Sequence, residues 1–370
     1  MVSIYGWALG ITGLLTAITT IRARGSSSST SAASVEFRRF QATFLIVYYI
    51  CMTADWLQGP YVYALYASYG FSKHDIAVLF VGGFGASMIF GTFVGAAADK
   101  MGRRRLCLLY CILYIMSCAT KHAQDYWILM VGRVLGGVAT SLLFSSFESW
   151  MVCEHNARGH DAASLSDTFS LMYFGNSLCA IMAGMVAQAA ADAVPLTSFS
   201  GVWHYGGYCS PFDLSAMCLV IGFVLITATW NENYGSPSVK GVDAIGGCAS
   251  VDKPLSHLKK DIRIQLIGII SMLRLVFIIS ALALALPTMT LDPVLTLGGM
   301  CVFEACVGIY WPAIGTVKSQ VASASLRVSQ DGLLGQVVPE DSRATIYNIF
   351  RVPLNAVVLA VLLNHMDVST

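Results

Sequence analysis

The stretch GAAADKMGRRR, residues 95–105, decides the fold of this chain. An acid and three consecutive arginines lie there in a glycine-bounded turn, between two apolar runs at 76–97 and 106–121 that are long enough to cross a membrane. Short loops rich in Lys and Arg are typical of the cytoplasmic side of multi-pass membrane proteins. The stretch therefore predicts a polytopic helical protein with this turn on its cytoplasmic face.

The composition of the chain favours the same class. Of 370 residues, 56% are hydrophobic and 12% are charged, and the mean hydropathy is +0.67. Soluble domains carry about 25% charged residues, so a chain this apolar needs the bilayer as its solvent. The net charge of +1 gives no indication of nucleic-acid binding. The 11 cysteines show no C-x-x-C pair and no zinc-ligand spacing, so we expect no metal and no disulfide framework.

Apolar runs of membrane-spanning length recur along the chain. A spanning helix needs about 20 mostly apolar residues. The first run ends before Arg22 and Arg24 and has no positive charge ahead of it, which favours an N-out signal anchor over a cleaved signal peptide. The criterion predicts about ten spans, at residues 3–21, 41–63, 76–97, 106–121, 126–149, 166–190, 211–230, 264–286, 294–313 and 345–363.

The basic residues test this set of spans, because cytoplasmic loops hold an excess of Lys and Arg. With residues 22–40 placed in the cytoplasm, strict alternation puts all but five of the 22 basic residues in cytoplasmic loops. Lys73 and Lys121 fall on the opposite side, and three arginines fall within spans. Such an asymmetry is hard to obtain from a wrong set of spans.

Two polar segments divide the predicted helices. Residues 22–40, serine-rich and then basic, follow a lone N-terminal helix at 1–21, and residues 231–258 form a long linker rich in Gly, Ser and Pro. Six predicted spans lie in 41–230, and only three lie in 259–370. We therefore expect an all-α transmembrane bundle with a complete six-helix N-terminal half and an incomplete C-terminal half.

Several strings resemble known transporters. The pattern G-x-x-x-D-x-x-G-R-R-R resembles the signature between the second and third helices of major facilitator proteins, which are built from two six-helix halves around a midplane site. More specific strings resemble the molybdate-anion transporter family of that superfamily: ADWLQGPYVY (54–63), QDYWILMVGRVLGGVATSLLFSSFESWMVCEH (124–155), NENYG (231–235), FEACVGIYWP (303–312) and YNIFRVPLN (347–355).

The resemblance implies a secondary transporter that moves an oxyanion, with molybdate as the expected substrate, by alternating access. It also implies two further helices after the 231–258 linker and one after the last span, which this sequence does not contain. No arrangement of catalytic residues stands out, so we expect neither an enzyme nor a bound cofactor. The expected partners are the oxyanion, protons and the lipid bilayer of the plasma membrane; the oligomeric state stays open.

Asp55 and Arg133 are the most informative ionisable residues within the apolar runs, where a charge is costly unless it is paired or hydrated. At about 1.5 Å per residue, both lie in the outer half of the membrane on antiparallel helices. Two interpretations stay open. The pair is either a structural ion pair, or Arg133 donates hydrogen bonds to an oxyanion while Asp55 titrates or holds it. Gln58, on the helix of Asp55, is the neutral donor that we expect in the same cavity.

The C-terminal half offers a second set of candidates. Glu304 and Arg351 lie at similar depths on antiparallel helices, so their side chains can pair. Asn348 precedes Arg351 by three residues and lies on the same helical face. A polar stripe of this kind is expected to face protein or water. Packing and substrate contact are both open roles for it.

We expect the basic turn to act as a conformational gate. The acids at the inner end of the 126–149 span are expected to interact with the arginines of the turn, because charge locks on the inner face hold one conformation of a transporter. The residues assigned to this gate are Gly95, Asp99, Gly102, Arg103, Arg104, Arg105 and Glu148.

Two alternatives to molybdate transport remain. A facilitator of the same fold could carry sulfate, a sugar or an organic anion. The chain could also be a truncated membrane protein that does not transport, because the seventh helix of the superfamily contributes to the central cavity and has no counterpart here.

Overall fold

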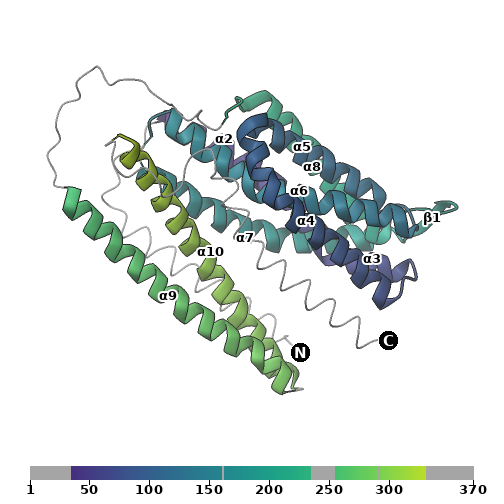
Figure 1. Ribbon diagram of the computed structural model, residues 1–370. Helices are drawn as coiled ribbons and strands as arrows, with labels where there is room; N and C mark the ends of the chain where they lie inside the picture. Colours follow the sequence, from purple (N-terminus) through teal and green to yellow (C-terminus); the bar gives the residue numbers. More distant parts are fainter. Residues whose placement is uncertain (1–34, 161, 235–254, 291, 331–370) are drawn as a thin grey trace. The chain divides into compact units, whose positions relative to one another are not determined.

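The computed structural model describes residues 35–160, 162–234, 255–290 and 292–330 (Figure 1). Within these ranges the chain is almost entirely α-helical, which confirms the expected all-α bundle. The chain divides into two units, Met1–Ala42 and Thr43–Thr370. Of the described residues, the first unit contains only 35–42, where the first described helix begins, and all the contacts described below lie within the second unit.

The helices of residues 35–234 follow one another along the chain, and a longer connection that contains a β-hairpin separates the last two (Figure 1). They are α2 (Val35–Gln58), α3 (Val62–Ser68), α4 (Lys73–Met101), α5 (Arg103–Thr120), α6 (Tyr126–Ala157), α7 (Ala162–Ala193) and α8 (Ser210–Thr229). The 3-10 turn η1 (Gly59–Tyr61) joins α2 to α3, and η2 (Gly207–Cys209) leads into α8. The later helices are α9 (Leu255–Met289) and α10 (Pro293–Gln330), which pack against each other.

Five helical stretches of the described residues are long and apolar enough to cross a membrane: Val35–Ser68, Lys73–Phe93, Tyr126–Ala157, Ser164–Ala193 and Gly207–Thr229. Shorter apolar stretches lie at Ser271–Leu286 and Val294–Tyr310. Helix α5 is not in this set, because its 18 residues include the three arginines at its start. The predicted spans at 3–21 and 345–363 lie outside the described residues.

Two helices begin inside segments that we expected to be linkers. Helix α2 starts at Val35, within 22–40, and α9 starts at Leu255, within 231–258. Polar residues continue these helices beyond their apolar parts, and composition alone does not show where the helix begins. The predicted division of the chain into two transporter halves stays a prediction.

A small β-hairpin lies at the end of α5 opposite the arginines, and the sequence analysis did not anticipate it. Strand β1 (Thr197–Ser200) pairs antiparallel with β2 (Trp203–Tyr205). The hairpin is joined to the α5–α6 connection: the backbone N–H of His204 donates to the His122 carbonyl at 2.8 Å, and that of Gln124 donates to Val202 at 2.7 Å. The hairpin thereby covers the end of the α5–α6 pair.

Helix α6 packs against both α4 and α5, and α5 also packs against α8. Small residues allow α4 and α6 to approach closely, as in many membrane helix pairs. A Cβ at Gly137 would collide with the carbonyl oxygen of Gly83. One turn further along α6, the Ser141 hydroxyl donates to the Ser87 carbonyl at 2.8 Å. Through this contact the side chain of α6 bonds directly to the backbone of α4, which keeps the two helices close together.

We expect Gly137→Ala to destabilise the protein by about 1–3 kcal/mol, because the added methyl group must push α4 and α6 apart. The matched control is Gly85→Ala, since a Cβ at Gly85 has no atom within 4 Å. This control should be neutral or stabilising by up to about 1 kcal/mol, because Ala is the better helix former. Thermal unfolding in detergent measures both variants. Equal melting temperatures would contradict the close contact.

Candidate functional site

A cavity of about 340 Å³ lies among α2, α4, α5 and α6. Three residues that we predicted from the sequence, Asp55, Gln58 and Arg133, line it together. They come from α2 and α6, which are far apart in the sequence. Hydroxyl groups of α4, α5 and α6 complete the polar part of the wall, from Ser87, Tyr114, Ser117 and Thr140.

The Asp55 carboxylate is partly buried at the cavity wall. The Tyr114 hydroxyl of α5 donates a hydrogen bond to one of its oxygens. The acid is thus oriented by a neighbouring helix.

Arg133 is held against α4. Its Nε donates to the Leu79 carbonyl at 3.3 Å, and its guanidinium carbon lies 4.5 Å from the centre of the Phe80 ring. A Cβ at Gly83 would lie 2.8 Å from Nη2, so this glycine makes room for the guanidinium. No carboxylate of the described residues lies within ion-pair distance of Arg133. Arg133 therefore lines the same cavity as Asp55 without a direct ion pair to it.

The amide donors of Gln58 bond to other parts of the protein, whereas we expected them to be available to a substrate. Gln58 is almost fully buried, and its Nε2 donates to Ser215 Oγ of α8 at 2.9 Å and to the Ala54 carbonyl at 3.3 Å. Its amide donors therefore join α2 to α8. Its role toward a substrate stays a prediction.

The cavity also contains a cation that we did not assign to the site from the sequence. Lys121 follows the last residue of α5 and lines the cavity with only 1% of its surface exposed. Its Nζ has no hydrogen-bond partner among the described residues. The available signal was the charge asymmetry, because Lys121 is one of two basic residues on the wrong side of the predicted distribution.

The arginine turn forms a reciprocal contact with the end of α8. The backbone N–H groups of Arg104 and Arg105 donate to the two carboxylate oxygens of Glu232 at 2.9 and 3.2 Å. The Arg104 guanidinium in turn donates to the carbonyls of Ile226 and Thr227, at 3.4 and 2.8 Å. An acid at the N-terminus of α5 and a cation at the C-terminus of α8 complement both helix dipoles and satisfy unpaired backbone groups.

Gly102 is required at this contact for two reasons. Its φ of +99° lies in the region that disfavours side chains, and a Cβ would collide with the Glu232 carboxylate. Glu232 belongs to the string NENYG, yet we expected the acid at the arginines to come from the end of α6. The sequence did not indicate this contact, because Glu232 lies 127 positions after Arg105.

The structure describes the surroundings of some, but not all, of the other residues assigned to the gate. Glu148 is buried and accepts a hydrogen bond from the Tyr173 hydroxyl at 3.0 Å, and Arg103 donates its backbone N–H to the Asn233 carbonyl. Gly95 and the side chain of Asp99 fall outside the described part of α4. Gating by these residues remains a prediction.

The candidates of the C-terminal half are not brought together in the described residues. Glu304 is exposed on α10. Arg351 and Asn348 lie outside the described residues, so the predicted pairing of Glu304 with Arg351 is untested.

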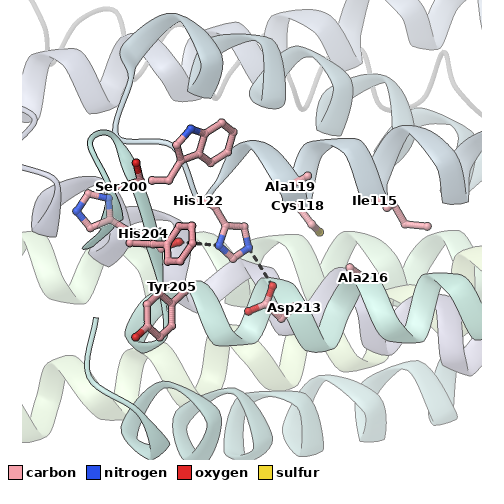
Figure 2. Close-up of a pocket in the computed structure, with 11 residues that line it drawn as sticks. Ile115, Cys118, Ala119, His122, Ser200, His204, Tyr205, Asp213 and Ala216 are labelled. Atoms are coloured by element: carbon pink, nitrogen blue, oxygen red, sulfur yellow. Dashed lines mark hydrogen bonds and ion pairs between the residues drawn. The ribbon is translucent and has the colours of Figure 1, made fainter. Parts of the chain in front are cut away.

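A second pocket, of about 900 Å³, lies beside the hairpin (Figure 2). Figure 2 shows His122 between two acceptors: its Nε2 lies 2.9 Å from Asp213 Oδ1 and its Nδ1 lies 2.9 Å from the His204 carbonyl. The hydrogen bond to Asp213 is the main cause that raises the pKa of His122 from 6.5 to about 10. The imidazole is therefore charged at neutral pH and donates from both nitrogens.

These features define a class of protein. Apolar spanning helices, a charged turn that joins two helix ends, and a buried polar cavity within the bundle are those of a multi-pass membrane protein of the major facilitator type, a class of transporters and not of enzymes. The MFS_5 family model, described as sugar transporters with 12 transmembrane helices, matches residues 7–273. The chain belongs to this family.

The chain is also similar to curated relatives. It is 41% identical over 215 residues to a molybdate-anion transporter of Xenopus tropicalis, a match that covers 58% of this chain and 45% of the relative. It is 39% identical over 242 residues to that of Xenopus laevis, with 64% and 51% covered, and 36% identical over 232 residues to that of Takifugu rubripes, with 62% and 46% covered. The chain thus spans about half the length of the curated relatives it matches.

A solved structure supports the fold. The crystal structure of the human organic anion transporter MFSD10 (TETRAN) matches with a TM-score of 0.58 and 12% identity, over 88% of this chain and 92% of that one. At this identity the match shows the fold alone. Together with the family match it confirms the major facilitator bundle expected from the sequence, and the relatives confirm the resemblance to molybdate-anion transporters.

We expect Gly102→Ala to destabilise the protein more than Gly159→Ala. Both glycines have positive φ, at +99° and +69°, but only Gly102 has a side chain, that of Glu232, where the Cβ would be. Strain alone costs about 1–2 kcal/mol, and the collision at Gly102 adds to it. Thermal unfolding of the two variants measures the difference. Equal losses would mean that Glu232 does not press against the turn.

The His122–Asp213 contact predicts a pH dependence. Because the folded pKa lies above the unfolded one, the contact stabilises the protein fully below about pH 6.5, and this stabilisation is lost as the pH rises through about 10. His122→Gln should lower the melting temperature by about 2–4 °C at pH 6 and by less at pH 10.5. The control is His74→Gln, whose histidine is exposed. A wild-type-minus-variant difference that does not change with pH would contradict the assignment.

Proposed function

We propose that this chain is a secondary transporter that moves an oxyanion, molybdate, across a membrane by alternating access. The observation that carries this proposal is the half-buried Arg133, whose terminal donors meet no described carboxylate at ion-pair distance in a cavity that it shares with Asp55. The similarity to proteins named molybdate-anion transporter supports the choice of substrate.

The chemistry of the cavity fits an oxyanion. A guanidinium presents several N–H donors in a planar fork, which can donate two parallel hydrogen bonds to neighbouring oxygens of a tetrahedral anion. The low dielectric of the bundle strengthens these charge-assisted bonds. Asp55, oriented by Tyr114, is the acid that would bind a proton when the anion enters and release it on the other side.

Alternating access requires a contact that closes one side of the cavity. We propose that the α5–α8 contact at Glu232 is part of this closure, with Gly95, Asp99 and Glu148 as further members. The C-terminal half would contribute Glu304, Asn348 and Arg351 to the same pathway. The location that we propose is the plasma membrane.

Uptake of labelled molybdate into proteoliposomes tests the function. Arg133→Ala should reduce uptake at least tenfold, because hydrogen bonds to a charged group contribute about 1.5–3 kcal/mol each. The control is Arg158→Ala, which removes an arginine paired locally with Glu154 at 2.9 Å. Normal uptake by the Arg133 variant would remove this residue from the site.

The family description supports a second candidate substrate, a sugar. Competition separates the candidates: excess tungstate or sulfate should inhibit molybdate uptake, whereas excess hexose should not. Inhibition by hexose alone would favour the sugar. An inserted and folded chain with no uptake of either solute would favour the alternative of a membrane protein that does not transport.

A further inference from the structure

We infer that Lys121 is a second cation of the substrate site, and that Lys121 and Arg133 together make the cavity select dianions over monoanions of the same shape. This inference rests on the proposed function and deepens it by naming the charge of the substrate. It concerns a residue that the sequence analysis placed outside the site.

The burial of Lys121 is the first argument. Its side chain is 1% exposed, and its Nζ has no hydrogen-bond partner among the described residues. Nor does any described carboxylate form an ion pair with it. Taking an ammonium group out of water costs several kcal/mol unless an opposite charge compensates it. An anion in the cavity would supply this charge.

Among the described residues, a cation–π contact offsets part of the cost of burying the ammonium. Nζ lies 5.6 Å from the centre of the buried Tyr66 ring. Cation–π contacts contribute about 0.5–2 kcal/mol. The hydroxyl of Tyr66 is itself buried without a partner among the described residues, so it accepts no hydrogen bond from the ammonium.

The backbone of Lys121 is held in place, which is what a binding residue needs. Its N–H donates to the Cys118 carbonyl at 3.0 Å, and its own carbonyl accepts from the Tyr69 hydroxyl at 2.7 Å. The ammonium therefore extends from a fixed point at the end of α5. A side chain held at its base loses less entropy when it binds.

The ammonium lies beside the stretch of α6 that carries Arg133. A Cβ at Gly132 would collide with the Thr120 side chain and would lie 3.2 Å from Lys121 Nζ, so the ammonium lies next to the α6 backbone one residue before Arg133. Lys121 and Arg133 both line the cavity. Two cations, one past the end of α5 and one on α6, thus line the same cavity as the acid Asp55 of α2.

The charges of the three groups specify the substrate. Lys121 and Arg133 contribute +2, and Asp55 contributes −1 when it is ionised. When Asp55 carries the proton that the proposed coupling requires, a dianion makes the loaded cavity neutral and a monoanion leaves one uncompensated positive charge. A monoanion neutralises the cavity only when Asp55 is ionised. Because Coulomb energy scales with the charge of the ligand, removing Lys121 should weaken a dianion more than a monoanion.

Molybdate and perrhenate are the probes for this experiment, since both are tetrahedral tetraoxo anions of similar size with charges of −2 and −1. The full chain is purified in detergent, and its thermal stabilisation by each sodium salt gives an apparent affinity. The wild type should bind molybdate more tightly than perrhenate. Lys121→Gln should weaken molybdate at least tenfold and perrhenate by less, so that the preference falls, and Lys121→Arg should keep it.

The matched control is Lys73→Gln. Lys73 is the other basic residue on the same predicted side of the membrane, but it is exposed at the start of α4. This variant should keep both affinities. If Lys121→Gln does not fold, Lys121→Met replaces it, because methionine keeps an unbranched apolar stem in the same space.

The outcomes separate the two proposals. A Lys121 variant with an unchanged ratio of molybdate to perrhenate affinity would overturn the role of Lys121 and leave the proposed function standing. A wild type that binds both anions equally would also overturn the selection of dianions. A wild type that neither anion stabilises would overturn the proposed function and this assignment with it.

Discussion

The close approach of α4 and α6 at Gly83 and Gly137 is the contact on which the cavity depends. With no side chain at either position, the backbone of α6 reaches the carbonyl of α4, and the Ser141 hydroxyl bonds to the same helix. The space left at Gly83 takes the guanidinium of Arg133, and the space at Gly132 takes the Thr120 side chain, with the Lys121 ammonium next to it. Small residues therefore both pack the helices and give the long side chain of Arg133 room inside the bundle.

Helix α5 connects the cavity to the arginine turn. At its N-terminus the backbone N–H groups bond to Glu232, and past its C-terminus Lys121 enters the cavity. In between, Tyr114 orients Asp55. A movement of α5 relative to α8 would break the dipole-complementing contact at one end and displace a cation at the other. The two regions are thus joined by one helix, through which the proposed substrate binding and the proposed closure would be coupled.

The sequence predicted the acid and the arginine of the cavity because an ionisable residue within an apolar run is stable in the membrane mainly when it has a partner or lies in a polar cavity. It did not predict Lys121, since this residue lies at the end of a predicted span, where an exposed lysine is ordinary. The sequence did not indicate Glu232 as the partner of the arginines, because the two are far apart in the sequence. The prediction assigned Glu148 to this role instead. Gln58 was predicted as a donor to substrate, but its amide donors are used by Ser215 and Ala54.

The sequence by itself determined that this is a helical multi-pass membrane protein, through its composition, its apolar runs and the distribution of Lys and Arg. The physical reason is that charges and unpaired backbone groups are costly in lipid, so few structures other than apolar helices can span it. The family strings determined the superfamily. Only the tertiary structure decided which charged groups share a cavity, which acid meets the arginine turn, and that a hairpin holds His122 beside Asp213. These outcomes depend on contacts between helices distant in the sequence, whose rotation and approach are set by side-chain packing and not by local pattern.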